Sequence, residues 1–184
     1  MLVECGFVRA TAEDGREWTF RPSFGRIATL GSPHEIVSLY AALHGPDAAA
    51  QASYVLACLC DQDDPTPLIG WRDETGAHAG LMPQAEQIII ARHLMEHGIV
   101  GKARPGKAAG GGGKFADAFD ASEYVAAARA HLGLSSADAE ALSMTELQQM
   151  LEMKFPDAGK RDRDVPTREE YDAQMAAFKE RGRV

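Results

Sequence analysis

Residues 7–37 read FVRATAEDGREWTFRPSFGRIATLGSPHEIV, and this stretch decides the predicted fold. Two β-prone runs, at 7–11 and 16–20, flank the Asp14-Gly15 pair. An Asp-Gly pair between two such runs favours the tight turn of a β-hairpin. The sequence therefore predicts an N-terminal β-hairpin.

A helical pattern follows the predicted hairpin directly. Residues 23–30 carry apolar side chains at helical spacing. Ser32, Pro33 and Glu35 then have the form of a capping box with proline at the first helical position. Residues 36–43 continue with one apolar face. We expect two consecutive helices here.

The next segments extend this helical region to about residue 100. We expect helices within 47–59 and 83–98, the second opened by proline and ended by glycine. Residues 68–71 are expected to be a short extended stretch before a turn at 73–76. The predicted fold class is α+β and mainly helical.

Residues 101–114 are rich in glycine and low in complexity. Such a chain has large conformational entropy and few side chains to bury, which predicts a flexible linker and a domain boundary. Capping boxes at 120–123 and 143–146 predict short helices after it. The predicted organisation is a hairpin-plus-helices domain at 1–100, a Gly-rich linker at 101–118, a small helical module at 119–156, and a charged tail with a terminal helix at 157–184.

The composition argues against several classes of function. The formal net charge is −8, and an acidic chain repels nucleic acids and anionic lipid surfaces. We therefore expect neither nucleic acid nor membrane as a partner. The three cysteines, Cys5, Cys58 and Cys60, are too few and odd in number for a disulfide framework, so a reducing cytoplasm is expected. No apolar run is long enough to span a bilayer.

Two motifs could carry chemistry. His93-Leu-Met-Glu96-His97 matches the inverted zinc-peptidase pattern, in which two histidines bind zinc and the glutamate is the base. No third ligand is evident, so ordinary histidines are the better interpretation. Residues 101–108 come close to a phosphate-binding loop, but Ala108 lacks the hydroxyl that would ligate magnesium. We expect no cofactor, no metal and no catalytic residue.

The order of elements carries a resemblance to a known family. A hairpin, the 21–30 segment, a helix entered by Ser-Pro-His-Glu-Ile-Val at 32–37, a Gly-rich joint and a small helical module follow one another. This order resembles the tail assembly chaperones of long-tailed, siphovirus-like bacteriophages. The runs 124–135 and 141–147 also resemble small phage tail-assembly modules. The resemblance extends to about residue 155.

The resemblance implies a non-enzymatic role in the host cytoplasm. Such a protein binds the tape-measure protein, keeps it soluble, helps to recruit tail-tube subunits and leaves before the virion is complete. Self-association of several copies is a further implication. A tape-measure protein is a long helical chain with apolar stripes, and grooves between amphipathic helices bind such partners.

One apolar face in the C-terminal module is the candidate binding surface. Its members lie at helical spacing, and methionine adapts to varied partners. The alternative is that these side chains pack the short helices of a small module together. The face consists of Leu142, Leu147, Met150, Leu151 and Phe155.

Other functions stay open. One alternative is a structural phage tail or connector protein that remains in the virion. Another is a small zinc-dependent hydrolase that uses His93, Glu96 and His97. A helix-turn-helix DNA binder built from residues 120–155 is a third, which the acidic charge opposes.

Overall fold

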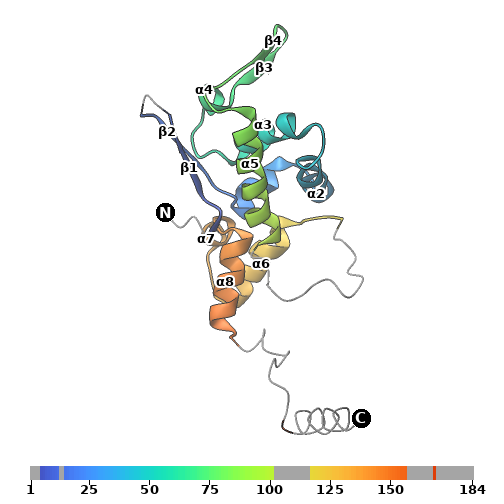
Figure 1. Cartoon of the computed structure of the whole chain (residues 1–184). Coiled ribbons are helices and arrows are strands. Elements are labelled where there is room, and N and C mark those ends of the chain that lie inside the picture. Colours follow the sequence, from blue (N-terminus) through green and yellow to red (C-terminus); the bar gives the residue numbers. More distant parts are fainter. Residues whose placement is uncertain (1–4, 13–14, 102–116, 157–167, 169–184) are drawn as a thin grey trace, which may run out of the picture. The chain divides into compact units, whose positions relative to one another are not determined.

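The computed structural model describes residues 5–12, 15–101, 117–156 and 168. An antiparallel hairpin opens the chain and helical segments dominate the rest, so the predicted α+β, mainly helical fold class is confirmed (Figure 1). The elements are β1 (Val8–Thr11), β2 (Glu17–Phe20), α1 (Phe24–Ile27), η2 (Ala28–Leu30), α2 (Pro33–Ala42), α3 (Ala48–Leu59), α4 (Thr66–Ile69), β3 (Trp71–Asp73), β4 (Gly76–His78), α5 (Gln84–Met95), the π-helical turn η3 (Glu96–Val100), α6 (Ala121–Leu132), α7 (Ser136–Glu140) and α8 (Met144–Lys154).

The predicted N-terminal hairpin pairs Val8 of β1 with Phe20 of β2, and the register continues to the pair of Thr11 and Glu17. Its apolar side chains face the core, where Phe20 is fully buried. The outer edge of β2 is also paired, because Phe20 forms a bridge with Cys60. The hairpin is therefore attached to the end of α3.

The helices of the N-terminal region enclose one apolar core. Helix α3 packs along α5, and α1 contacts both α3 and η3. The predicted capping box of α2 is present, with the Ser32 N–H donating to the Glu35 carboxylate at 2.7 Å. Phe24, Ile27 and Leu56 are fully buried where these helices meet.

The C-terminal helices α6 and α7 pack on α1 and share this core. The Phe24 and Tyr124 rings stack with centroids 5.7 Å apart, and Phe119 stacks on Tyr124 at 5.0 Å. The Phe24 N–H donates to the Leu142 carbonyl at 2.8 Å, and the Phe119 N–H donates to the Pro33 carbonyl.

One compact unit consequently extends to Leu151, and a second begins at Glu152. The sequence predicted a separate module at 119–156, but residues 119–151 share the first unit with residues 5–101. The Gly-rich segment suggested a boundary, whereas the aromatic contacts across it depend on residues far apart in the chain. Most of the predicted linker and the predicted terminal helix at 157–184 lie outside the described residues.

The region around residue 68 differs from the prediction. Residues 66–69 form the helical turn α4, and the extended strand β3 begins only at Trp71. The Asp64 carboxylate starts this turn by accepting the Thr66 N–H at 3.0 Å. Gly70 ends it with a φ of 83°. A local carboxylate-to-backbone bond therefore outweighed the β-propensity of Leu68 and Ile69.

In the described part of the chain, no helix is both long enough and apolar enough to cross a bilayer.

Candidate functional site

The predicted C-terminal face contributes in part to the core. Leu147 is only 2% exposed, while Leu142 and Leu151 are half-buried against the core cluster. Met150, on α8, is also half-buried. Phe155 belongs to the second unit and is 43% exposed. The role of these five residues in binding a partner stays a prediction.

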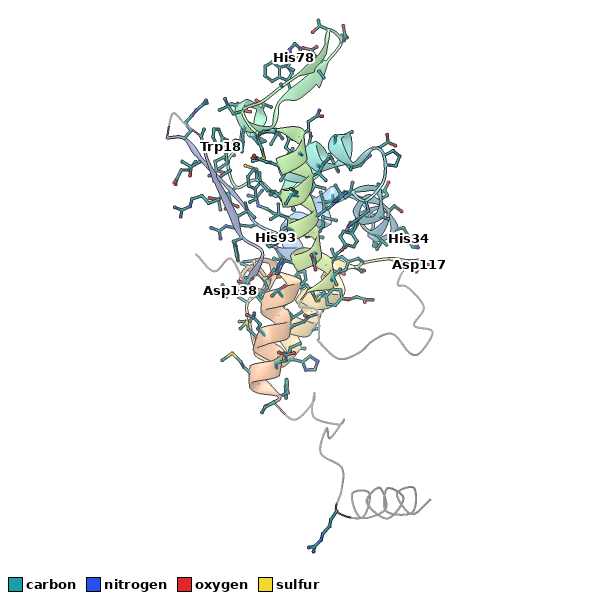
Figure 2. All side chains as sticks on the ribbon, viewed as in Figure 1. Trp18, His34, His78, His93, Asp117 and Asp138 are labelled. Carbon is teal, nitrogen blue, oxygen red and sulfur yellow. The ribbon has the colours of Figure 1, made fainter. Side chains whose placement is uncertain are left out.

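The His93–His97 segment forms a contact between helices. Figure 2 shows His93 on α5, and its ring centroid lies 4.5 Å from that of His97. The His97 Nδ1 atom lies 2.8 Å from the Thr145 hydroxyl at the start of α8. Burial, followed by the neighbouring His93, lowers the pKa of His97. Among the described residues, no group of three or more His, Cys, Asp and Glu side chains could hold a metal ion.

Cys58 and Cys60 lie at structural positions on and at the end of α3. Cys60 is buried at the C-terminus of α3, and burial raises the pKa of its thiol. Cys58 is half-buried on the same helix. Gly101 follows the π-helical turn rather than a strand, and the remainder of the predicted phosphate-loop-like stretch lies outside the described residues.

A hollow of about 690 Å³ lies where the first turns of α3 and α5 approach the β3–β4 hairpin. We call it the Trp71 hollow. Its lining is mainly apolar or small and includes Trp71. The lining residues are Pro46, Asp47, Ala49, Ala50, Ser53, Ile69, Gly70, Trp71, Ala77, His78, Ala79, Gly80, Met82, Pro83, Gln84 and Gln87.

The β3–β4 hairpin holds Trp71 in place. Trp71 pairs with His78 across the two strands, and their rings stack with centroids 4.7 Å apart. The His78 Nε2 atom lies 3.0 Å from the Asp73 carboxylate, a contact that orients the imidazole. Figure 2 shows His78 on this hairpin, well away from His93. Trp71 remains 50% exposed despite these contacts.

The turn of this hairpin is fixed by Asp73. Its carboxylate accepts the Thr75 N–H at 2.8 Å and also the Thr75 hydroxyl. These hydrogen bonds, first the one from the Thr75 hydroxyl and then the one from His78, lower the pKa of Asp73 to about 2. The carboxylate is therefore ionised at neutral pH and holds the turn.

Glycine is required at the base of the same hairpin. Gly70 has a φ of 83°, and a Cβ there would lie 2.3 Å from the His78 carbonyl oxygen. The two strands can approach each other only because this side chain is absent. The close approach sets the position of Trp71 beside the hollow.

Gln87 forms part of the wall of the hollow and is 2% exposed. Its Nε2 donates to the carbonyls of Ile69 at 2.9 Å and Met82 at 3.0 Å. Its Oε1 accepts the Ser53 hydroxyl at 2.8 Å. One side chain thus joins α3, α5 and the two ends of the segment that carries the β3–β4 hairpin.

A second hollow, of about 680 Å³, lies beside the outer edge of β1. We call it the hairpin groove. Leu81 is its most exposed apolar side chain, at 56%. The groove is lined by Arg9, Ala10, Thr11, Ala12, Leu68, Leu81, Met82, Glu86 and Ile90.

Sequence reasoning missed both hollows. A local signal existed for the first, because a hairpin turning at 73–76 places residues 71 and 78 opposite each other. A tryptophan and a histidine in that register predict a stacked, amphipathic pair. No local pattern predicts the groove, because its two walls come from segments about 60 residues apart in the chain.

Comparison with known protein families gives one finding. Residues 45–173 match a family described as a family of unknown function, DUF6246. The chain belongs to the DUF6246 family. No curated protein and no solved structure matches it.

The range that matches the family contains the whole lining of the Trp71 hollow but only part of the lining of the hairpin groove. Every residue that lines the Trp71 hollow lies within the part that matches DUF6246, which starts at residue 45. The strands β1 and β2 precede that part. Within DUF6246, the Trp71 hollow is therefore the candidate site that the family match covers completely.

Proposed function

We propose that this chain is a non-enzymatic assembly protein that holds an apolar segment of a partner polypeptide in the Trp71 hollow. The observation that carries the proposal is Trp71 itself, a tryptophan 50% exposed at the wall of a hollow of about 690 Å³. Tryptophan dominates the energetics of many protein interfaces because it buries a large area at low conformational cost.

The hollow has the dimensions of a recognition site. A volume of several hundred Å³ accommodates a few side chains of a partner. The hydrogen bonds of Gln87 and the Asp73 turn hold its walls in place before a partner arrives. Preorganised walls reduce the entropy that binding must overcome.

The resemblance to phage tail assembly chaperones names a specific partner. In this proposal the partner is the tape-measure protein, and the bound chain helps to recruit tail-tube subunits. A helical partner presents apolar residues at intervals of three and four, and one such residue would enter the hollow against the Trp71 ring. The role requires binding and release but no catalytic residue.

Co-expression with the proposed partner, the long coiled-coil-rich tape-measure protein, tests this function. We expect that protein to become soluble and to co-purify with the full chain. Trp71→Ala should weaken its capture by about tenfold or more, since truncation of a central interface tryptophan costs about 2 kcal/mol or more. Val100→Ala is the matched control, because Val100 is also 50% exposed but does not line the hollow.

The results of this experiment separate the proposals. A partner that stays insoluble and fails to co-purify would refute the chaperone function. Equal capture by the Trp71 and Val100 variants would refute the Trp71 hollow as the binding site.

Two further measurements test the remaining alternatives. Met150→Asp, in the predicted C-terminal face, reports whether α8 contributes to binding. A chaperone is absent from purified virions, whereas a structural tail or connector protein is present in them.

A further inference from the structure

The outer edge of β1 carries main-chain groups that point away from the hairpin. The Ala12 N–H donates to the Arg16 carbonyl at 2.9 Å, which makes residues 12 and 16 a hydrogen-bonded pair. In an antiparallel ladder such pairs alternate with non-hydrogen-bonded pairs. Ala10 therefore faces β2, while Arg9 and Thr11 direct their N–H and C=O groups to the outer edge.

The opposite edge of the hairpin confirms this alternation. Thr19, the partner of Arg9, directs its main-chain groups outward from β2. Its carbonyl accepts the Asp61 N–H at 2.7 Å, and its N–H donates to the Gln62 side chain. The β2 edge is thus satisfied by residues 59–62. Among the described residues, no hydrogen bond of this kind satisfies the Arg9 and Thr11 main chain.

Apart from its short length and the charge of Arg9, the β1 edge lacks the features that protect an exposed strand. Natural edge strands are also protected by proline, by further charges, or by a bulge that prevents pairing with another chain. Residues 8–12 read VRATA, with no proline, no carboxylate and a single positive charge. The hairpin groove leaves space beside this edge, and its rim carries the exposed Leu81.

We propose that the β1 strand of a second copy of this chain pairs with this edge. The two β1 strands run antiparallel about a two-fold axis at Ala10, so the two hairpins form one four-stranded sheet. Arg9 of each copy then lies opposite Thr11 of the other. All the outward N–H and C=O groups of these residues pair in this one register.

The sequence of β1 makes this pairing self-complementary. Ala10 meets Ala10 of the second copy at the non-hydrogen-bonded position, where the Cα atoms approach to about 4.5 Å and a small side chain fits best. Arg9 faces a threonine, so no two like charges oppose each other. An isologous interface needs one surface that complements itself, and this edge meets that condition.

The groove contributes apolar contact to the same interface. Val8, Ala10 and Ala12 pack against the core, and directly opposite residues of paired strands share one face of the sheet. The second copy's apolar side chains therefore lie on the same side as Leu81 and Ile90. Pairing would cover Leu81, which is 56% exposed in the single chain. This inference does not rest on the proposed function, because β1 lies outside the Trp71 hollow.

Sedimentation equilibrium of the full chain tests the proposal. We expect a concentration-dependent monomer–dimer equilibrium. Arg9→Pro removes an outward N–H that the hairpin does not use, so it should raise the dimer dissociation constant at least tenfold. Arg9→Gln keeps the N–H and removes only the charge, and it should dimerise within about threefold of the native chain.

Two further measurements keep the test decisive if Arg9→Pro disturbs the fold. Leu81→Asp lies outside the strand and should also weaken the dimer, whereas Val100→Asp should not. Amide exchange of the native chain should show Arg9 and Thr11 protected only at concentrations where the dimer forms. A chain that stays monomeric, or that dimerises equally as Arg9→Pro and Arg9→Gln, would overturn the inference. Protection of these amides that appears only when the tape-measure protein is added would overturn the inference and assign the edge to a different polypeptide.

Discussion

At the scale of the residue, Gln87 joins the parts of the Trp71 hollow through one side chain. Replacing it by methionine keeps the volume but leaves the Ile69 and Met82 carbonyls without their donor. A buried polar group that loses its partner costs about 1–3 kcal/mol, so we expect Gln87→Met to lower the free energy of unfolding by about that amount. Urea denaturation measures the change. Gln84→Met, on the exposed first turn of α5, should change stability by less than about 0.5 kcal/mol.

The lowered pKa of His97 makes the free energy of unfolding depend on pH. Burial and the neighbouring His93 lower its pKa in the folded chain, against a smaller opposing effect of Glu96. The unfolded chain then binds its proton at a higher pH than the folded chain does. The contribution of neutral His97 to stability is fully present above a pH of about 6.5 and declines as the pH falls through the folded pKa.

Urea denaturation between pH 7.5 and pH 5.5 measures this dependence. We expect the native chain to lose stability across the range and His97→Gln to lose less of it. Equal losses in the two proteins would show that His97 is not the group responsible.

At the scale of the element, the caps of the C-terminal helices determine where those helices begin. Ser143 is fully buried, accepts the Glu146 N–H at 3.2 Å, and donates its own N–H to the Glu146 carboxylate at 2.8 Å. Ser143→Ala removes the capping hydroxyl and should cost about 1 kcal/mol, measured by thermal unfolding. Ser136→Ala is the comparison, because Ser136 is the first residue of α7 and its hydroxyl donates to the exposed Glu140 side chain at 3.0 Å instead of capping a main-chain N–H. An unchanged melting temperature for Ser143→Ala would contradict the capping role.

These caps also show what the sequence can predict. The Ser32 and Ser143 boxes involve residues close together in the chain, and the structure contains both. At the predicted 120–123 box, the Asp120 carboxylate caps the helix by accepting the Ser122 N–H at 2.9 Å. The π-helical turn at 96–100 was not predicted. Within it Gly98 lies against Ile27 and Pro22, residues more than 70 positions earlier in the chain. Hydrogen bonds between residues close together in the chain can be predicted from the sequence, whereas contacts between distant segments cannot.

At the scale of the whole molecule, the first unit should unfold as one. Removing residues 101–184 would expose Phe24 and strip Phe119, Met144 and Leu147 from the core cluster. Each such side chain contributes about 1.5–3 kcal/mol, so the total approaches the stability of a typical domain. We therefore expect a chain shortened to residues 1–100 to lose its cooperative thermal transition, and one that ends at Pro156 to keep it. A cooperative transition in the shorter chain would contradict this expectation and support the independent N-terminal domain that the sequence predicted.

Contacts between residues far apart in the chain also limited the prediction of the site. The composition of the Gly-rich segment predicted a boundary, but the stack of Phe24, Tyr124 and Phe119 joins residues on both sides of it within one unit. The fold class followed from the hairpin and the capped helices. The Trp71 hollow required the packing of α3, α5 and the β3–β4 hairpin, which no periodicity encodes.

Capture of a partner polypeptide through Trp71 is the central claim, and one measurement tests it most directly. The native chain, Trp71→Ala and Val100→Ala are each co-expressed with the proposed partner, the long coiled-coil-rich tape-measure protein. The amount of co-purified partner is then compared. The account predicts equal recovery with the native chain and Val100→Ala, and a loss of about tenfold or more with Trp71→Ala. Equal recovery with all three proteins, or recovery with none, would contradict it.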